Sequence, residues 1–550
     1  MPSQLSFDIP ASNKLSVDEV AEALQVSTAS VRNWIKTGYL ETTNGSQISR
    51  ASFDTFKASV VGEEKLTSRA NKSNFDGHDH EDIQATFLKR IFNLKSHEFD
   101  SIGSAYETSL SNSYRNKEGV YYTPAELTKR FFDFIEGDVS TLTFCDPCCG
   151  SGNFIVEALN RGFLPENIYG FDCDPVAVEI TKARIKQKTN FDSNTILVAD
   201  FLDDIVLKIN TKRPAFDIIM TNPPWGKKLP ASKKIQITSA FGCAKSTDTS
   251  ALFLRAALQQ VSSNGIIGML LPESFFNIAS FSPTRQIVAG HNLLGFVDFG
   301  KPFNGLITKA KGIIFQKLKA PQNDNNVLCE TSTSTHSRSQ NSFIENPKHI
   351  FNFECTEETH AVIRRVYDTP HVTLESNAKW GLGIVTGNNK KHVRSCQSGE
   401  DVPVYKGSEI VDGPLSNASN FISNDLSQYQ QVAPHHLYYS PEKLIYRFIS
   451  SRLVFHHDTQ SKLFLNSANM LVLNNDFPLS HKETAWLLNT KIVNWIFRTV
   501  FDTHKVLRSD LEALPMFHDF FNQAGDITEE NLHAYLNVAE EKDGTFRIKK

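Results

Sequence analysis

The fold of this chain is decided by the stretch Thr141-Leu142-Thr143-Phe144-Cys145-Asp146-Pro147-Cys148-Cys149-Gly150-Ser151-Gly152. Its first part, Thr141–Phe144, reads as a short buried strand, and the segment after the stretch, Asn153–Leu159, has helical character. Strand, glycine turn and helix in this order form the nucleotide-binding geometry of α/β proteins, because glycines let a ligand approach the backbone closely. The stretch therefore predicts a Rossmann-like α/β sheet.

Two further strands are expected downstream of the glycine turn. Beginning about 20 residues later, Ile168–Asp172 reads as a strand that ends in a carboxylate able to accept both hydroxyls of a ribose. Ile196–Ala199 reads as a third strand, followed by Asp200, a polar acceptor, and Phe201, an aromatic face for an adenine ring. The chain has neither a glycine-lysine phosphate loop nor a complete GxGxxG, so the expected ligand is an adenosine without phosphates.

A candidate catalytic motif follows the apolar run Phe216–Met220. It is Asn222-Pro223-Pro224-Trp225. An exocyclic amine is a poor nucleophile, and hydrogen bonds that accept both of its protons push its nitrogen toward sp3 character. The side-chain carbonyl of Asn222 and the rigid backbone carbonyl of Pro223 are suitable acceptors, and Trp225 offers a flat face for stacking. Taken alone, the motif favours a proline-rich turn at the end of a buried strand over a catalytic site.

Together these motifs resemble the gamma class of S-adenosylmethionine-dependent DNA adenine-N6 methyltransferases of restriction-modification systems, the Taq-like enzymes with a C-terminal target-recognition domain. The segment Gly119–Leu127 is similar to the cofactor segment that precedes the glycine loop in this class, and the resemblance covers roughly residues 119–520. The order of cofactor segment, loop, catalytic motif and long C-terminal region marks the gamma class. One departure is Trp225, where Tyr or Phe is commoner.

The resemblance implies roles for individual residues. The cofactor is S-adenosylmethionine, and its binding residues are Tyr122, Thr123, Asp146, Gly150, Ser151, Gly152, Asp172, Asp200 and Phe201. The catalytic residues are Asn222, Pro223, Pro224 and Trp225. Trp225 and Phe303, which lies in the turn that begins at Val297, are implied to stack on an extruded base. No covalent intermediate is required.

The resemblance continues toward the carboxyl terminus. Gly265–Pro272 is similar to the next core strand of the class. The segments similar to its target-recognition domain are Gly381–Lys390, Pro403–Gly407, Glu442–Arg447, Leu487–Lys491 and Leu511–Pro515.

The amino-terminal region carries a separate pattern. Ser16 is expected to cap a helix with Val20 on its apolar face, and a turn at Gln25–Ser27 leads to a second helix that bears Trp34 and closes at Gly38. This pattern is similar to the winged helix-turn-helix of MerR and excisionase proteins. The predicted DNA-facing residues of the second helix are Arg32, Asn33 and Lys36. Such modules also serve as protein contacts or as packing units.

These patterns divide the chain into five expected segments. They are a winged helix-turn-helix (1–62), a linker and helical segment (63–118), the methyltransferase catalytic domain (119–320), an exposed junction (321–345) and an α+β target-recognition domain (346–550). Glu81–Asp100 has helical spacing and is expected to pack on the catalytic domain. The loose stretch Ala320–Ser342, with its serine and threonine cluster, is expected to be an exposed excursion.

Composition limits the class of protein. The chain has 550 residues, 40% of them hydrophobic, with no long apolar run, so we expect about three domains and no membrane partner. The start lacks the basic and apolar residues of a signal peptide, and the eight cysteines are irregularly spaced, so we expect a cytoplasmic protein. The net charge of −4 excludes a nonspecific polycation but not local basic surfaces that contact phosphates.

The cysteine cluster before the glycine turn has a metal interpretation that we disfavour. Cys145, Cys148 and Cys149 have no second pair or histidine partner at zinc-finger spacing. We therefore expect small buried side chains beneath the cofactor and no metal.

The expected activity is methyl transfer from S-adenosylmethionine to N6 of a flipped adenine in double-stranded DNA. It would protect DNA in a restriction-modification system whose endonuclease is a separate protein, because the amino-terminal segment shows no PD-(D/E)xK arrangement. Several alternatives stay open: N4-cytosine methylation, in which Ser is usual at the position of Asn222; methylation of RNA or of a protein glutamine; and a DNA-binding regulator that retains the fold.

Overall fold

The computed structural model describes residues 14–23, 28–36, 40–43, 47–59, 78–91, 93–110, 121–206, 215–244, 247–303, 306, 308–318 and 324–549. The chain forms two compact units. The first comprises Met1–Pro214 and Met220–Ile237, and the second comprises Ala215–Ile219 and Thr238–Lys550. The division between them falls inside strand β7 (Phe216–Thr221).

The largest sheet of the described residues has nine strands in the order β12-β11-β9-β10-β8-β7-β4-β5-β6. In the first unit, β4 (Phe144–Asp146), β5 (Ile168–Asp172) and β6 (Ile196–Val198) are parallel neighbours. The predictions for β5, for β6 and for the helix after the glycine turn, α8 (Asn153–Asn160), are confirmed to within one residue. The strand predicted at Thr141 is wrong in its start, because Leu142 closes a turn onto the carbonyl of Val139 and pairing begins at Phe144.

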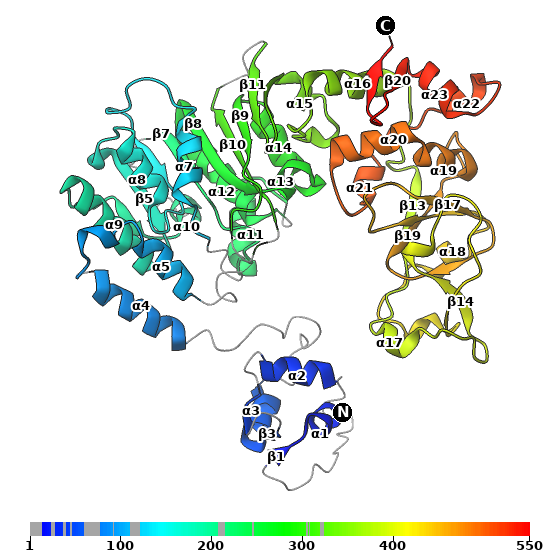
Figure 1. The fold of residues 1–550 in the computed structure, drawn as a ribbon, viewed down its shortest axis with the longest axis horizontal. Helices are drawn as coiled ribbons and strands as arrows, with labels where there is room; N and C mark the ends of the chain where they lie inside the picture. Colours follow the sequence, from blue (N-terminus) through cyan, green and yellow to red (C-terminus); the bar gives the residue numbers. More distant parts are fainter. Residues whose placement is uncertain are drawn as a thin grey trace. The chain divides into compact units, whose positions relative to one another are not determined.

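Helices α4 (His78–Ile91) and α5 (Ile102–Ser109) lie beside α9 (Pro175–Thr189) (Figure 1). Phe87 and Tyr106 pack with Val176 and Ile180 of α9 in one apolar cluster, so the helical segment packs on a helix of the predicted catalytic domain, as expected. The helix predicted over Glu81–Asp100 is too long at its carboxyl end, because α4 ends at Ile91 and a 3-10 turn, Ser96–Glu98, follows. The other helices of this region are α7 (Ala125–Phe132), α10 (Phe201–Val206) and α11 (Ala231–Ala240).

In the second unit, β10 (Ala310–Gln316) pairs antiparallel with both β8 (Val261–Pro272) and β9 (Asn292–Asp298). Strand β11 (Asn326–Glu330) runs parallel to β9 and forms a hairpin with β12 (Thr335–Ser339). The helices of this part are α12 (Thr249–Gln260), α13 (Ser274–Asn277), α14 (Ser282–Ala289) and α15 (Asn341–Ile344).

The hairpin β11–β12 corrects the expected exposed excursion over Ala320–Ser342 and the expected junction 321–345. Val327, Cys329 and Arg338 point inward and are at most 1% exposed, while serines and threonines occupy the turn and the outer face. Alternation of buried and exposed residues is the pattern of a strand, and the serine and threonine content hid it. Residues 319–323 lie outside the described residues.

The carboxyl-terminal part is α+β, as predicted. One sheet has the order β13-β19-β16-β17, with β13 (Ala378–Leu382), β19 (Ala468–Leu473), β16 (Lys443–Arg447) and β17 (Phe455–Asp458). A second has the order β15-β14-β18, with β15 (Asn420–Ile422), β14 (Val402–Tyr405) and β18 (Leu463–Phe464). A buried ion pair of 2.6 Å joins Lys443 on β16 to Asp458 on β17.

Helices cover the first of these sheets on one side, where α19 contacts β16 and β17 (Figure 1). The helices of this part are α16 (Glu357–Asp368), α17 (Asn389–His392), α18 (His435–Tyr438), α19 (His481–Asn489), α20 (Lys491–Ile496), α21 (Arg508–Leu511), α22 (His518–Gln523) and α23 (Glu529–Tyr535). Strands β20 (Val538–Glu540) and β21 (Phe546–Ile548) pair near the carboxyl terminus. Among the described residues, no helix has both the length and the apolar content needed to cross a bilayer.

The amino-terminal segment contains two of the predicted helices, α1 (Val17–Ala23) and α2 (Thr28–Lys36). Ser16 caps α1, because its hydroxyl accepts the N–H of Glu19 and the Glu19 carboxylate accepts the N–H of Ser16. A small antiparallel sheet, β1 (Lys14–Leu15), β3 (Gln47–Ser49) and β2 (Thr42–Thr43), and helix α3 (Arg50–Ser59) complete the segment.

The winged helix-turn-helix stays a prediction. The turn Gln25–Ser27, the closing Gly38, most of the linker from Gly62, and the side chains of Asn33 and Lys36 lie outside the described residues. So do Gly119 and Val120 of the predicted cofactor segment. Arg32 is described and exposed on α2.

Candidate active site

A pocket lies where the first-unit strands end. Strands β4 and β5 end in Asp146 and Asp172, and β7 ends one residue before Asn222. The residues that line the pocket are Tyr121, Tyr122, Thr123, Asp146, Cys148, Cys149, Gly150, Ser151, Asn153, Phe154 and Asn222. Residues that the sequence assigned to cofactor binding and to catalysis thus line one cavity.

The turn after β4 has a conformation that requires glycine. Gly150 and Gly152 have φ values of 51° and 85°, which side-chain-bearing residues rarely adopt. A Cβ atom on Gly150 would lie 2.9 Å from the ring of Tyr122, and one on Gly152 would lie 2.7 Å from the hydroxyl of Thr181. That hydroxyl donates to the Gly150 carbonyl at 2.9 Å, so the turn is held against α9.

Two side chains that the sequence analysis missed also hold the turn. Arg184 on α9 donates to the carbonyl of Ser151 and to the side chain of Asn153, each at 2.7 Å. The amide of Asn153 in turn donates to the carbonyl of Thr123 at 2.7 Å, which ties the predicted cofactor segment to the turn. Asn153, the first residue of α8, could have been suspected from its position, whereas no local signal marks Arg184.

The two strand-end carboxylates lie in a poorly solvated environment. Asp146 is 1% exposed and accepts the N–H of Cys148, and burial raises its pKa to about 7. Asp172 accepts the N–H groups of Gly150 at 2.8 Å and of Asp174 at 2.9 Å, and burial raises its pKa to about 6. A cationic ligand would stabilise the ionised form of both groups.

The pocket has the chemistry to receive a cationic nucleoside such as S-adenosylmethionine. Asp172 does not line the cavity but accepts the N–H of Gly150, which does. Besides the carboxylate of Asp146, the lining includes the hydroxyl of Tyr122, which is buried and has no hydrogen-bond partner among the described residues. A buried polar group of this kind is normally satisfied by a ligand or by water. The cavity itself is narrow, about 20 Å³, so the side chains around it must part to admit a nucleoside.

Asn222 presents an acceptor to this pocket. Its Nδ2 group donates to the carbonyl of Tyr121 at 2.9 Å. Because the amino group is committed to the backbone, the Oδ1 atom is the part of the amide left to accept a hydrogen bond. The following Pro223 is buried, and Pro224 and Trp225 are half-buried.

Other predicted residues do not line the pocket. Asp200 accepts from the ammonium of Lys233 at 2.6 Å and from the N–H of Leu202 at 3.0 Å. Phe201 is 2% exposed, with its ring centroid 5.3 Å from that of Phe171. Phe303, in the second unit, is also buried. Lys233 was missed, because nothing near Asp200 in the sequence points to it.

The cysteines near the pocket are neutral thiols. Burial raises the pKa of both Cys148 and Cys149 well above the usual range. Among the described residues, no group of three or more His, Cys, Asp or Glu side chains is arranged to hold a metal ion.

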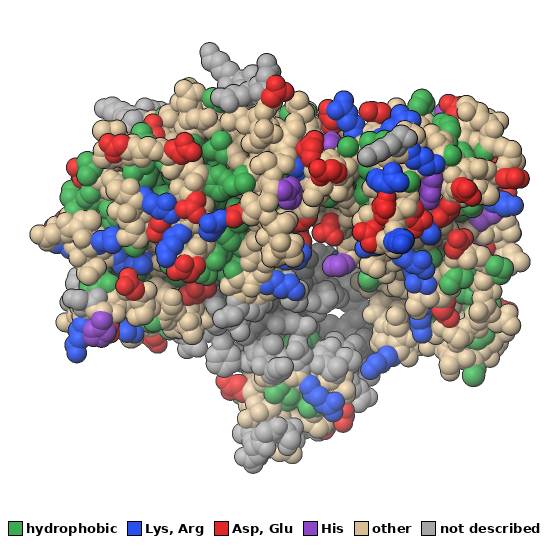
Figure 2. Space-filling view, turned by 45° about the horizontal axis from the view of Figure 1, so that its top comes forward, with side chains coloured by type: hydrophobic (Ala, Val, Ile, Leu, Met, Phe, Trp, Pro, Cys, Tyr) green, Lys and Arg blue, Asp and Glu red, His purple; other side chains and the backbone are tan. Residues whose placement is uncertain are grey.

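One face of the molecule carries charges of both signs. On the face that Figure 2 presents, Lys and Arg side chains are interspersed with Asp and Glu side chains. On this face, contact with a polyanion would depend on local groups of basic residues.

Two separate regions of the chain match known protein families. Residues 97–360 match the family described as N-6 DNA Methylase, and residues 402–516 match the TaqI-like C-terminal specificity domain. The chain is 45% identical over 411 residues to Type II methyltransferase M.VspI of Vibrio sp. (strain 343), a match that covers 75% of this chain and 99% of that one.

More distant relatives share parts of the chain. Over 190 residues it is 26% identical to Type II methyltransferase M.CvrRI of Paramecium bursaria Chlorella virus XZ-6E, covering 34% of this chain and 45% of that one. Among solved structures, the Type IIL restriction-modification enzyme MmeI in complex with DNA aligns with a TM-score of 0.50 at 13% identity, covering 79% of this chain and 72% of that one. At this identity the structural likeness concerns the fold alone.

Proposed function

The chain belongs to the N-6 DNA methylase family, as a gamma-class methyltransferase with a TaqI-like C-terminal specificity domain, and from this premise we propose that it methylates adenine at N6 in double-stranded DNA. Its mixed α/β sheet is the methyltransferase fold of this family. The observation that carries the proposal is that Asn222 and Asp146 line one pocket. A methyl donor held by Asp146 would then face an amine held by Asn222.

In this proposal the glycine turn and the strand ends hold S-adenosylmethionine, which supplies an electrophilic methyl group on a sulfonium. Asp172 would accept the ribose hydroxyls, and Gly150, which lines the pocket, would let the ligand approach the backbone. Gly152 would contribute by holding the turn against Thr181 of α9. Asp146 supplies negative charge beside the cation. The remaining cofactor contacts would come from Tyr122, Thr123, Ser151, Asp200 and Phe201; the carboxylate of Asp200 would exchange its ion pair with Lys233 for the adenine amine.

The target amine requires a base outside the helix. The N6 atom of a stacked adenine is not open to in-line attack on a sulfonium methyl, so the nucleotide must be extruded at a cost of a few kcal/mol. Stacking on Trp225 and Phe303 would offset this cost, at about 1–3 kcal/mol per base. The Oδ1 atom of Asn222 and the carbonyl of Pro223 would accept the two N–H groups and so orient the amine toward the methyl group that the cofactor supplies.

Membership of this family also suggests how the DNA sequence is selected and in which system the enzyme acts. The specificity domain would select the DNA sequence, and Arg32, Asn33 and Lys36 of the amino-terminal segment would add DNA contacts. The relatives named Type II methyltransferases support a role in a Type II restriction-modification system. The proposal adds that the endonuclease would be a separate protein and that the enzyme would act on DNA in the cytoplasm.

The product of the reaction tests this proposal. The full-length protein is incubated with methyl-labelled S-adenosylmethionine and with DNA, RNA or protein, and labelled DNA is digested to nucleosides. We expect label only in DNA and only as N6-methyladenine. Label in N4-methylcytosine would instead support the alternative amine substrate, since both reactions need the same acceptors, and label in RNA or protein would contradict the DNA assignment.

A further inference from the structure

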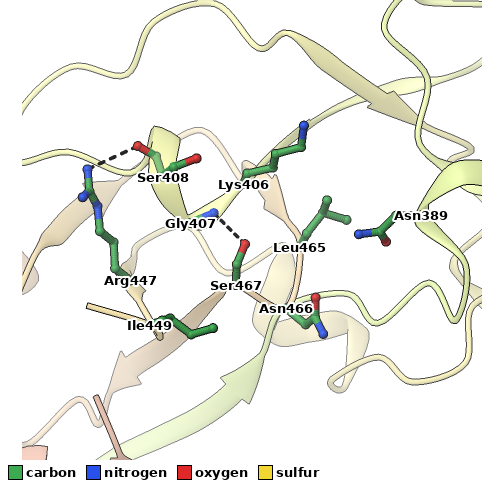
Figure 3. Close-up of a pocket in the computed structure, with 9 residues that line it drawn as sticks. All are labelled: Asn389, Lys406, Gly407, Ser408, Arg447, Ile449, Leu465, Asn466 and Ser467. Atoms are coloured by element: carbon green, nitrogen blue, oxygen red, sulfur yellow. Dashed lines mark hydrogen bonds between the residues drawn. The ribbon is translucent and has the colours of Figure 1, made fainter. Parts of the chain in front are cut away.

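A hollow of about 410 Å³ opens on the carboxyl-terminal part of the second unit, and none of the residues assigned above lines it. It is lined by Asn389, Lys406, Gly407, Ser408, Arg447, Ile449, Leu465, Asn466 and Ser467. Figure 3 shows Lys406, Asn389, Asn466 and Ile449 spaced around it, with Leu465 and Ser467 between them. All but Asn389 fall within the residues that match the specificity domain.

The base of the hollow is rigid. A Cβ atom on Gly407 would lie 2.2 Å from the carbonyl oxygen of Ser467, so two backbone segments touch here, and the Gly407 N–H donates to the Ser467 hydroxyl at 2.8 Å. Arg447 clamps the next turn by donating to the carbonyls of Ile410 at 2.8 Å and Ser408 at 3.2 Å (Figure 3). Arg447 is therefore a positioning residue.

Ile449 is an apolar side chain held out in solvent. At 65% exposure it is the most exposed large hydrophobic residue of the described part of the chain. Its backbone is fixed, because Ile449 bridges Lys505 and the next residue, Ser450, donates its N–H to the carbonyl of His504 at 3.1 Å. A single exposed hydrophobic residue is common on protein surfaces, so what distinguishes Ile449 is its place in the lining of the hollow, beside polar and basic side chains.

Two amides face the same space. The Oδ1 atom of Asn389 accepts from the hydroxyl of Thr386 at 2.5 Å, which leaves its Nδ2 group to donate outward. Asn466 is exposed, and its backbone N–H donates to Ile384 at 3.1 Å, which anchors the residue without using its side chain. Amide groups can pair with the hydrogen-bonding edges of bases.

The charge around the hollow is positive. Its lining includes Lys406 and Arg447 and no carboxylate. Lys390 and Lys391 are exposed in α17, directly after Asn389. The nearby Glu409, which accepts from the N–H of Lys406 and from the hydroxyl of Ser419, keeps one negative charge against these four basic side chains. In a chain with a net charge of −4, this local basic character favours an anionic occupant.

We propose that this hollow is a base-reading site for double-stranded DNA, in which Ile449 packs on a thymine methyl in the major groove, Asn389 and Asn466 pair with base edges, and Lys406 contacts a phosphate. A DNA duplex offers apolar methyl groups, amide-matched edges and phosphates within the width of one groove. The inference rests on the proposed function, because it names residues that would select the DNA substrate.

The test combines protein and DNA substitutions in a binding assay. Duplexes that the wild-type protein selects from a randomised pool are titrated by fluorescence anisotropy, with each thymine replaced in turn by uracil, which lacks the methyl group. We expect one replacement to weaken wild-type binding about fourfold, the effect of one buried methyl-sized group, and to leave binding by Ile449→Ala unchanged. Ile527→Ala, an isoleucine 46% exposed elsewhere, should respond as wild type does.

Substitutions of the polar residues should change base discrimination or the salt dependence of binding. Asn389→Ala and Asn466→Ala should each reduce discrimination at one base pair by about tenfold. Lys406→Ala should weaken binding to all duplexes alike and reduce the slope of log affinity against log salt by about 1. Lys482→Ala, an exposed lysine outside the hollow, should leave that slope unchanged.

The proposal is wrong if Ile449→Ala keeps the wild-type response at every thymine and both asparagine variants keep the wild-type base preferences. Wild-type methyl transfer to the same duplexes, measured in parallel, separates the two claims. If the variants change DNA selectivity but the wild-type protein transfers no methyl group, the proposed function is wrong and the base-reading role of the hollow is retained. A wild-type protein that binds no duplex would overturn both.

Discussion

In the proposed function, the buried carboxylate of Asp146 would couple cofactor binding to pH. Burial raises its pKa from an ordinary value of 3.8 to about 7, so the ligand-free protein holds a proton there that an unfolded chain would have lost. This stabilisation is complete below about pH 4 and is lost as the pH rises through 7. A cationic cofactor reverses the preference, because the ionised carboxylate attracts it. Binding near neutral pH should therefore release a proton.

Substitution of Asp146 by Asn tests this coupling. In the wild-type protein, affinity for S-adenosylmethionine should rise by about tenfold per pH unit between pH 6 and 7 and then level off. In Asp146→Asn, affinity should be lower at pH 8 and nearly flat over the same range, with a remaining slope below pH 6 from Asp172. Calorimetric titration in buffers of different ionisation enthalpy measures both the affinity and the proton. Parallel pH profiles in the two proteins would refute the role given to Asp146.

At the scale of elements, the junction of β4 and α8 is the feature on which the pocket depends. Gly152 starts α8 with φ of 85°, and its missing side chain lets Thr181 of α9 approach the turn. The strand and both helices are thus locked at one point. A side chain at this position meets two separate penalties, one from backbone strain and one from crowding.

Two glycine substitutions separate these penalties. Gly137 has a φ of 86°, and a Cβ atom added there would meet no other atom within 4 Å, so Gly137→Ala should cost about 1 kcal/mol from strain alone. Gly152→Ala should cost about 1–3 kcal/mol more, from contact with Thr181, and should weaken cofactor binding. Denaturant unfolding measures the first effect and calorimetry the second. Equal losses in both variants would show that Thr181 yields without cost.

Over the whole molecule, the sequence predicted the features that depend on local residue patterns, such as where strands end and which polar residues follow them. Parallel strands end at one edge of a sheet, so the acids after two apolar runs and Asn222 after a third could be expected to share a pocket, and Asn222 and Asp146 do line one. Lys233, beside Asp200, and Arg184, beside Ser151, could not be expected, because tertiary packing brings these pairs together. The hairpin β11–β12 was missed because its exposed face and turn are rich in serine and threonine.

The role of Asn222 is tested by the single-turnover rate of N6-methyladenine formation in Asn222→Ala, with the cofactor dissociation constant measured on the same sample. The matched control is Asn167→Ala, which also removes an amide bonded to a backbone carbonyl but lies outside the pocket lining. We expect Asn222→Ala to lose at least about 100–1,000-fold in rate while binding S-adenosylmethionine normally, and the control to keep its rate. A rate for Asn222→Ala close to that of the control would contradict the claim that Asn222 accepts the target amine.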